Sequence, residues 1–191
     1  DRISMLEMNR NPRIDGFTTN PSLMRKAGIT DYVSFAREIL HSITDKPVSF
    51  EVFADEFDEM ERQAREIATW ASNVYVKIPV TNTMKVSSAE LIQKLSKDGV
   101  QLNITAILTL EQVRVVGNAL KDGSSAFVSI FAGRIADTGL DPVPLMQNAL
   151  ESLKLSRGEW ALCLSPQGVK STLEQSLSFP STVLGILLRK T

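Results

Sequence analysis

The sequence is poor in the residues from which disulfides and metal sites are built. Its 191 residues include one cysteine, Cys163, and one histidine, His41. A lone cysteine cannot form an internal disulfide, which fits a reducing compartment, and the two residues together offer no ligand cluster with metal-binding spacing. We therefore expect a cytoplasmic protein without a metal site, in which His41 is an ordinary surface or helix-end histidine.

Charge and hydropathy exclude two further classes of protein. The formal net charge is -1, aromatic residues make up 6% of the chain, and there is no basic run, so nothing indicates a nucleic-acid partner. We expect no signal peptide before Asp1, and no apolar stretch is long enough to cross a bilayer. With 43% apolar residues, the chain is predicted to form a single globular domain over residues 1–191.

Strand-like and helix-like segments alternate along the chain. The predicted strands span residues 48–54, 73–80, 100–108, 126–132 and 160–164. Helices are predicted near the first ten residues, from Thr30, over 56–72, from Ser87, from Thr109 and from Pro142. Ser87 with Glu90, and Thr109 with Gln112, have the spacing of capping boxes, and residues 19–22 are predicted to form a turn. Alternation of this kind predicts a parallel sheet.

Two parallel architectures fit this alternation. A doubly wound sheet would show a glycine-rich turn after its first strand, and the sequence has none. A (β/α) barrel brings one or two polar residues per strand toward a shared site at the carboxyl ends of the strands. The otherwise apolar strands carry such residues: Ser49, Glu51, Lys77, Asn103, Thr105 and Ser129. The pattern therefore favours the barrel.

Lys77 is the residue that most needs an explanation. It lies in the β-branched run Asn73–Val80, which is typical of a strand buried on both faces. There, either a carboxylate pairs with the ammonium, or the amine loses its proton and becomes a nucleophile that can form a Schiff base with a carbonyl. The alternative is an edge strand from which Lys77 points into water.

Four motifs resemble one family: the first is on an extended segment predicted at residues 14–18, and the other three are on predicted strands. These are Gly16-Phe17-Thr18-Thr19-Asn20-Pro21-Ser22, Val76-Lys77-Ile78-Pro79-Val80-Thr81, Leu102-Asn103-Ile104-Thr105, and Ser129-Ile130-Phe131-Ala132-Gly133-Arg134-Ile135. Together, over about residues 1–155, they are similar to the transaldolase and fructose-6-phosphate aldolase family. The resemblance implies a (β/α)8 TIM barrel of class I aldolase type that uses no metal or organic cofactor.

The resemblance also implies roles for individual residues. Lys77 would form the Schiff base with a ketose, and Glu51 and Thr105 would hold the water that transfers protons. Asn20 and Asn103 would bind the hydroxyls of a dihydroxyacetone unit. The other residues implied to bind substrate are Ser129, Phe131, Arg134 and Ser165. Of these, Arg134 would bind the phosphate group of the sugar.

Aldolase members of the family tend to carry Gln and Tyr where this chain has Glu51 and Phe131. The resemblance therefore implies the transaldolase branch, with sugar phosphates as partners. The reaction would exchange sedoheptulose 7-phosphate and glyceraldehyde 3-phosphate for erythrose 4-phosphate and fructose 6-phosphate. The alternatives are a fructose-6-phosphate aldolase and a non-catalytic remnant of the barrel. From the residues alone, Glu51 and Lys77 could equally be a structural ion pair.

The sequence departs from the family pattern in three places. The first-strand aspartate has no counterpart, because Asp1 aligns better with a second aspartate of the family. Gln167 follows Ser165 where the family has a basic residue, and residues 183–191 resemble neither the last strand nor the last helix. We therefore expect a barrel that lacks its first strand and has a degraded last unit. Homo-oligomers occur in the family, so a homo-oligomer is possible here, but the resemblance does not decide the oligomeric state of this chain.

Overall fold

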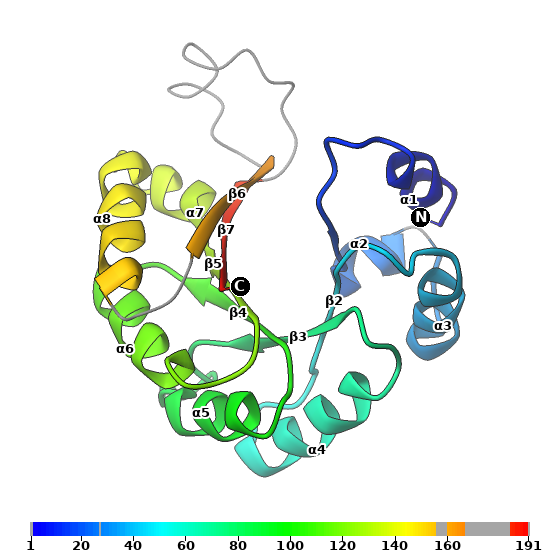
Figure 1. The fold of residues 1–191 in the computed structure, drawn as a ribbon, viewed down its shortest axis with the longest axis horizontal. Coiled ribbons are helices and arrows are strands. Elements are labelled where there is room, and N and C mark those ends of the chain that lie inside the picture. The colour runs from blue at the N-terminus through cyan, green and yellow to red at the C-terminus, as the bar shows by residue number, and fades with distance from the viewer. Residues whose placement is uncertain (1, 27, 156–159, 167–183, 191) are drawn as a thin grey trace. The chain divides into compact units, whose positions relative to one another are not determined.

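A computed structural model of the chain describes residues 2–26, 28–155, 160–166 and 184–190 (Figure 1). The chain divides into two compact units, residues 1–77 and 78–191, and strand β3 crosses the boundary. Unit 1 contains α1 (Arg2–Asn9), β1 (Phe17–Thr18), α2 (Pro21–Lys26), α3 (Tyr32–Ser42), β2 (Val48–Glu51), α4 (Phe57–Ala68) and most of β3 (Val74–Pro79). Unit 2 contains α5 (Ala89–Lys97), β4 (Leu102–Ile107), α6 (Leu110–Leu120), β5 (Ala126–Ile130), α7 (Ala132–Asp137), α8 (Pro142–Leu155), β6 (Trp160–Pro166) and β7 (Leu184–Lys190).

The sheet of unit 1 consists of parallel strands in the order β1-β2-β3. Val48 and Phe50, on one face of β2, and Ser49, on the other face, are all buried, as expected for a strand covered on both faces. Strand β2 ends at Glu51, earlier than the predicted residue 54. The cause is Gln63 of α4, whose Oε1 accepts the backbone N–H groups of Phe53 at 2.8 Å and Ala54 at 3.1 Å. Those N–H groups bond a side chain rather than another strand.

Helices α3 and α4 each bury one apolar stripe against the sheet. Asp31 caps α3, because its carboxylate accepts the backbone N–H of Ser34 at 3.0 Å, and the helix therefore begins at Tyr32 rather than at the predicted Thr30. The buried residues of α3 are Phe35, Ala36, Ile39 and Leu40, and those of α4 are Met60, Ala64 and Ile67. These positions recur at helical spacing, as the sequence predicts.

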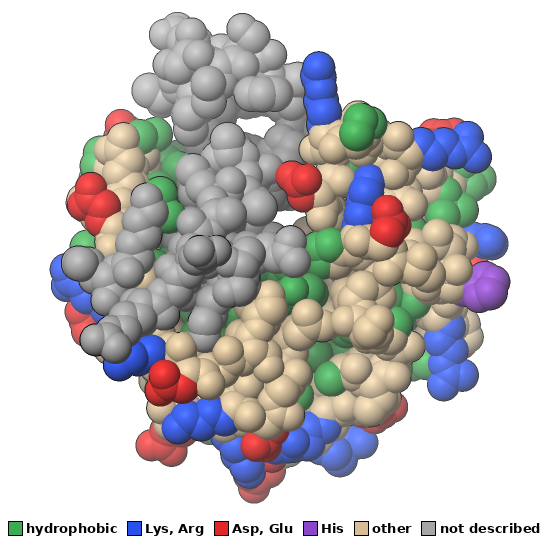
Figure 2. All heavy atoms as spheres, in the orientation of Figure 1, with side chains coloured by type: hydrophobic (Ala, Val, Ile, Leu, Met, Phe, Trp, Pro, Cys, Tyr) green, Lys and Arg blue, Asp and Glu red, His purple; other side chains and the backbone are tan. Residues whose placement is uncertain are grey.

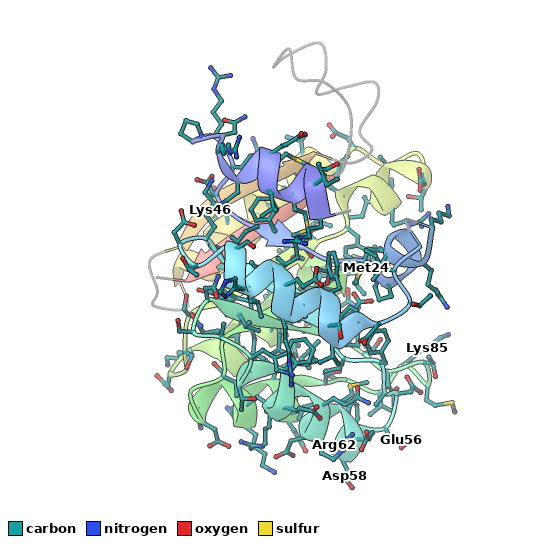
Figure 3. The ribbon with its side chains drawn as sticks, turned by 90° about the vertical axis from the view of Figure 1, so that its right-hand side faces the viewer. Met24, Lys46, Glu56, Asp58, Arg62 and Lys85 are labelled. Carbon is teal, nitrogen blue, oxygen red and sulfur yellow. The ribbon has the colours of Figure 1, made fainter. Side chains whose placement is uncertain are left out.

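Lys46 ties the end of α1 to the start of β2 (Figure 3). Its Nζ donates to the carbonyl of Asn9 at 2.7 Å and to that of Asn11 at 3.2 Å. The last carbonyls of a helix have no partner within the helix, and a cation there also interacts favourably with the helix dipole. Lys46 therefore stabilises the end of α1, the helix that the sequence predicts near the first ten residues.

In unit 2, β4 and β5 are parallel neighbours, and α5, α6 and α8 follow one another along one side of them (Figure 1). The predicted capping box of α6 is confirmed. The Thr109 hydroxyl accepts the backbone N–H of Gln112 at 3.2 Å, and the Gln112 side chain accepts that of Thr109 at 3.1 Å. The parallel strands β1 to β5 with intervening helices are the arrangement of an incomplete (β/α) barrel, as predicted.

The last described strands interrupt the parallel pattern. Strand β6 confirms the prediction of a strand at residues 160–164, but β7 lies between it and β5 and is antiparallel to both. Ala126 of β5 pairs with Lys190, and Cys163 of β6 pairs with Leu187. An antiparallel pair therefore stands where a complete barrel would continue with parallel strands. This agrees with the expected degraded last unit.

Two local predictions are wrong. Ser87 and Glu90 do not form a capping box: Ser88 is the N-cap of α5, makes no side-chain capping bond, and buries its hydroxyl. The predicted turn at residues 19–22 is also incorrect, because Pro21 opens α2 and the carbonyl of Asn20 accepts the N–H of Met24 at 2.9 Å. Proline suits the first position of a helix, since its missing N–H would have no helical partner there.

Gly16 marks a close approach between two segments of unit 1. The N–H of the following residue, Phe17, donates to the carbonyl of Pro47 at 2.8 Å. A Cβ added at Gly16 would lie 2.8 Å from Pro47 Cγ and 2.9 Å from the Pro47 carbonyl oxygen. Glycine is therefore required here by space rather than by backbone angles.

We predict that Gly16→Ala lowers the free energy of unfolding by about 1–3 kcal/mol, the usual cost of forcing an extra carbon into a packed position. Urea unfolding followed by circular dichroism measures the change. Asp15→Ala, at the exposed neighbouring residue, is the control and should lie within about 0.5 kcal/mol of the unmodified chain. Equal stabilities for Gly16→Ala and the control would contradict the packing argument.

Candidate active site

Lys77 occupies an interior strand, and little of its side chain reaches water. Strand β3 lies between β2 and β4, and only 12% of the Lys77 side chain is exposed. Val76 and Ile78, on the opposite face of the strand, are completely buried. The alternative of an edge-strand lysine in solvent is therefore wrong.

The ammonium group of Lys77 contacts a carboxylate on the neighbouring strand. In the parallel register of β2 and β3, Glu51 stands directly beside Lys77. Lys77 Nζ donates to Glu51 Oε2 at 2.7 Å and to the backbone carbonyl of Thr19 at 2.9 Å. Hydrogen bonds between charged groups at such distances are among the stronger ones in proteins. The ammonium is thus held by two oxygens from two different segments.

Thr19 and Tyr32 extend this contact into a network. The hydroxyl of Thr19 donates to the carbonyl of Ser49 at 3.0 Å and lies 3.2 Å from the Tyr32 hydroxyl. The Tyr32 hydroxyl also accepts the backbone N–H of Glu51 at 2.9 Å. Because Thr19 already uses its proton on Ser49, Tyr32 is the donor in the bond between the two hydroxyls.

Tyr32 is held by aromatic side chains around its ring. The ring centroids of Phe50 and Phe53 lie 5.9 and 5.0 Å from that of Tyr32, both edge to face, and that of Trp70 lies 6.2 Å away. Burial raises the pKa of Tyr32 to about 12, although its hydrogen bonds to Thr19 and to the Glu51 backbone act in the opposite direction. The phenol is therefore neutral over the whole physiological range.

Neither Thr19 nor Tyr32 is among the site residues predicted from the sequence. Thr19 had a usable signal, because it directly precedes Asn20 within the first motif that carries the family resemblance. Tyr32 had none: it opens an amphipathic helix, and only the structure reveals that this helix start lies against the ends of β1 and β2. Asn20 itself follows Thr19 at an exposed position.

A second polar cluster lies in unit 2. The Ser129 hydroxyl of β5 donates to Asn103 Oδ1 of β4 at 2.7 Å, and both residues are buried. Buried polar groups are costly unless they are hydrogen-bonded, so this pair needs its mutual contact whatever else it does. The structure thus joins Glu51 with Lys77 in unit 1, and Asn103 with Ser129 in unit 2.

Strand β4 is irregular beside Thr105. The register with β5 shifts between Ile104 and Ile107, and Ala106 has a φ of 60°, a left-handed conformation that alanine seldom adopts. The Thr105 hydroxyl lies 3.5 Å from the Ile78 carbonyl, a long contact. Bulges of this kind redirect the side chains near them.

The remaining predicted site residues differ in how they are placed. Phe131 is the N-cap of α7 and is 37% exposed. Arg134 lies inside α7 rather than at a strand end, and its guanidinium is 3.4 Å from the carboxylate of Asp137, with both side chains largely exposed. Ser165 belongs to β6, for which only the backbone is described.

Outside these clusters the described surface carries mixed charge. Basic and acidic side chains are interspersed over the face in Figure 2, and His41 lies exposed in the last turn of α3, as predicted. Within the described residues, no three His, Cys, Asp or Glu side chains gather as metal ligands would. None of the helices described combines the length and apolar character that crossing a bilayer requires.

Comparison with known proteins identifies the family of the chain. The sequence profile described as "Transaldolase/Fructose-6-phosphate aldolase" matches residues 1–182. The chain therefore belongs to the transaldolase/fructose-6-phosphate aldolase family, as the four motifs predict.

Named relatives agree with this assignment. A probable transaldolase of Dehalococcoides mccartyi is 41% identical over 141 residues, covering 74% of this chain and 62% of that protein. One from Streptococcus agalactiae is 40% identical, covering 74% and 61%, and one from Methanococcus maripaludis is 39% identical, covering 76% and 63%. The chain thus spans little more than three fifths of the length of these relatives.

The raised pKa of Tyr32 predicts a loss of stability at alkaline pH. The pKa of Tyr32 is about 12 in the folded chain and 10.0 ordinarily, so the folded state favours the neutral phenol. The stability that this preference contributes is complete below pH 10 and disappears as the pH rises to about 12. We expect the unfolding free energy of the unmodified chain to fall over this window by about 2 kcal/mol more than that of Tyr32→Phe. Urea titrations at stepped pH measure this difference, and parallel losses in the two proteins would contradict it.

Proposed function

We propose that this chain transfers a dihydroxyacetone unit between sugar phosphates through a Schiff base on Lys77. One observation carries the proposal: a lysine with 12% of its side chain exposed contacts a carboxylate at 2.7 Å. A Schiff-base lysine needs shielding from water and a group that accepts its proton. Glu51 is such a group, and family membership favours this use of the pair over a purely structural ion pair.

The contacts of Lys77 suggest the order of proton transfers. Glu51 first takes a proton from the Lys77 ammonium. The free amine then attacks the ketone carbon of the donor sugar, and the carbonyl oxygen takes a proton from the attacking nitrogen to become a hydroxyl. Glu51 returns its proton to this hydroxyl, which leaves as water. The products are an iminium ion on Lys77 and an ionised Glu51. In this scheme the Thr19 carbonyl, 2.9 Å from Nζ, keeps the amine aimed during the exchange.

Cleavage and transfer follow from the electron demand of the iminium. When the bond between carbons three and four breaks, its electron pair moves toward the iminium nitrogen, and the hydroxyl on carbon four gives up its proton to the ionised Glu51 to become an aldehyde. The three-carbon unit stays on Lys77 as an enamine, which attacks the aldehyde of an acceptor sugar while Glu51 returns the proton to the aldehyde oxygen. Water then hydrolyses the new iminium, which releases the product ketose and restores the Lys77 amine. Glu51 and Phe131 favour this transfer over simple aldolase cleavage, because the aldolase members that the chain resembles tend to carry Gln and Tyr instead.

We predict that borohydride, added with fructose 6-phosphate, fixes a covalent adduct on Lys77. Reduction turns the imine into a stable amine, so peptide mass spectrometry should find the added mass on Lys77 and not on Lys85, an exposed lysine of the following loop (Figure 3). Lys77→Met should abolish the adduct. An adduct spread equally over both lysines, or none at all, would reject the proposed function.

We further predict that Arg134 binds the phosphate of the donor sugar. Its exposed pair with Asp137 contributes little, so a phosphate can displace that carboxylate. Arg134→Met should raise the KM for fructose 6-phosphate by about tenfold, the effect of losing one charge-assisted hydrogen bond, and should barely change that for unphosphorylated fructose. Asp137→Asn is the matched control and should not raise either KM. Equal increases for both sugars would show that Arg134 does not bind the phosphate.

A further inference from the structure

The hydroxyl of Tyr32 contacts both segments that hold the Lys77 ammonium. It accepts the backbone N–H of Glu51 at 2.9 Å and bonds to the hydroxyl of Thr19 at 3.2 Å. Glu51 and Thr19 are also the residues whose oxygens accept hydrogen bonds from Lys77 Nζ, at 2.7 and 2.9 Å. One oxygen atom of Tyr32 therefore links the two supports of a single amine.

The hydrogen bonds of this group run in one direction. The Glu51 N–H donates to Tyr32, Tyr32 donates to Thr19, and Thr19 donates to the carbonyl of Ser49. Consecutive bonds polarise one another in a setting of low dielectric constant, so loss of the middle hydroxyl weakens the bonds on both sides. It also leaves the N–H of Glu51 without this acceptor.

Tyr32 is well placed to act as a rigid support. It is the first residue of α3, directly after the Asp31 cap, and its ring is held by Phe50, Phe53 and Trp70. Phenylalanine at this position would keep the ring contacts and remove only the hydroxyl. The role of the hydroxyl can therefore be separated from that of the aromatic cluster.

We propose that Tyr32 is a positioning residue for Lys77, acting through Thr19 and Glu51 to fix where the amine points. Its effect on the reaction with a ketose rests on the proposed function, whereas its effect on the amine does not.

The first test needs no sugar. In nitrogen-detected NMR, the Lys77 ammonium, assigned by its loss in Lys77→Met, should exchange its protons with water slowly in the unmodified chain. In Tyr32→Phe the exchange rate of the Lys77 ammonium should rise by up to about tenfold, because the Thr19 carbonyl and the Glu51 carboxylate that accept its hydrogen bonds are less firmly held. Ser42→Ala is the control: it removes a hydroxyl from the same helix, where Ser42 bonds the Glu38 carbonyl at 3.1 Å, and should leave the exchange rate unchanged.

A second variant tests the route of the effect and serves if Tyr32→Phe does not fold. Thr19→Val keeps the shape of Thr19 and removes its hydroxyl, so it should raise the exchange rate as Tyr32→Phe does. The double variant should show less than the sum of the two effects on a logarithmic scale, because both changes break the same bond. Fully additive effects would overturn the proposed route through Thr19.

The third measurement uses the ketose. In Tyr32→Phe the rate of adduct formation on Lys77 with fructose 6-phosphate and borohydride should fall by about tenfold or more, while the ketose concentration that gives half the maximal rate stays the same. Suppose that the unmodified chain forms the adduct but the ammonium exchange rate in Tyr32→Phe equals that of the Ser42→Ala control. That result overturns the positioning role. Failure of the unmodified chain to form an adduct rejects the proposed function, and the NMR comparison still decides the role of Tyr32.

Discussion

The bonds from the Lys77 ammonium to Glu51 and Thr19 depend on three strands at once. Thr19 follows β1, Glu51 ends β2, and Lys77 lies on β3, so the parallel register of unit 1 brings these residues together. A slip of one residue in β3 would turn Lys77 to the opposite face, where Val76 and Ile78 are packed. The same apolar packing that stabilises the sheet therefore determines where the charge lies.

The fold could be predicted because its signals are local or periodic. The apolar spacing in α3 and α4, the capping box at Thr109 and the alternation of strands with helices all depend on residues close in sequence. The predicted capping box at Ser87 was wrong because a spacing alone does not show which serine takes the cap position. The end of β2 depends on Gln63, which belongs to the next helix.

The candidate site could be predicted only in part. The lysine in an apolar strand and the acid one strand earlier are visible in the sequence, and their contact follows from a parallel register. The roles of Thr19 and Tyr32 depend on how a helix start meets the ends of two strands, which no local pattern encodes. Arg134 lies in α7 because helical structure resumes almost directly after β5, a boundary that the continuous apolar run conceals.

Strand β7 has a consequence for the order in which unit 2 can form. Its residues 186–190 pair with the whole of β5, although α7, α8 and β6 lie between the two strands in the chain. Contacts between residues so distant in sequence form slowly, because a large loop must close before they yield any stabilisation. During synthesis on the ribosome, one edge of β5 has to wait for residues 184–190 to emerge before this pairing can be completed.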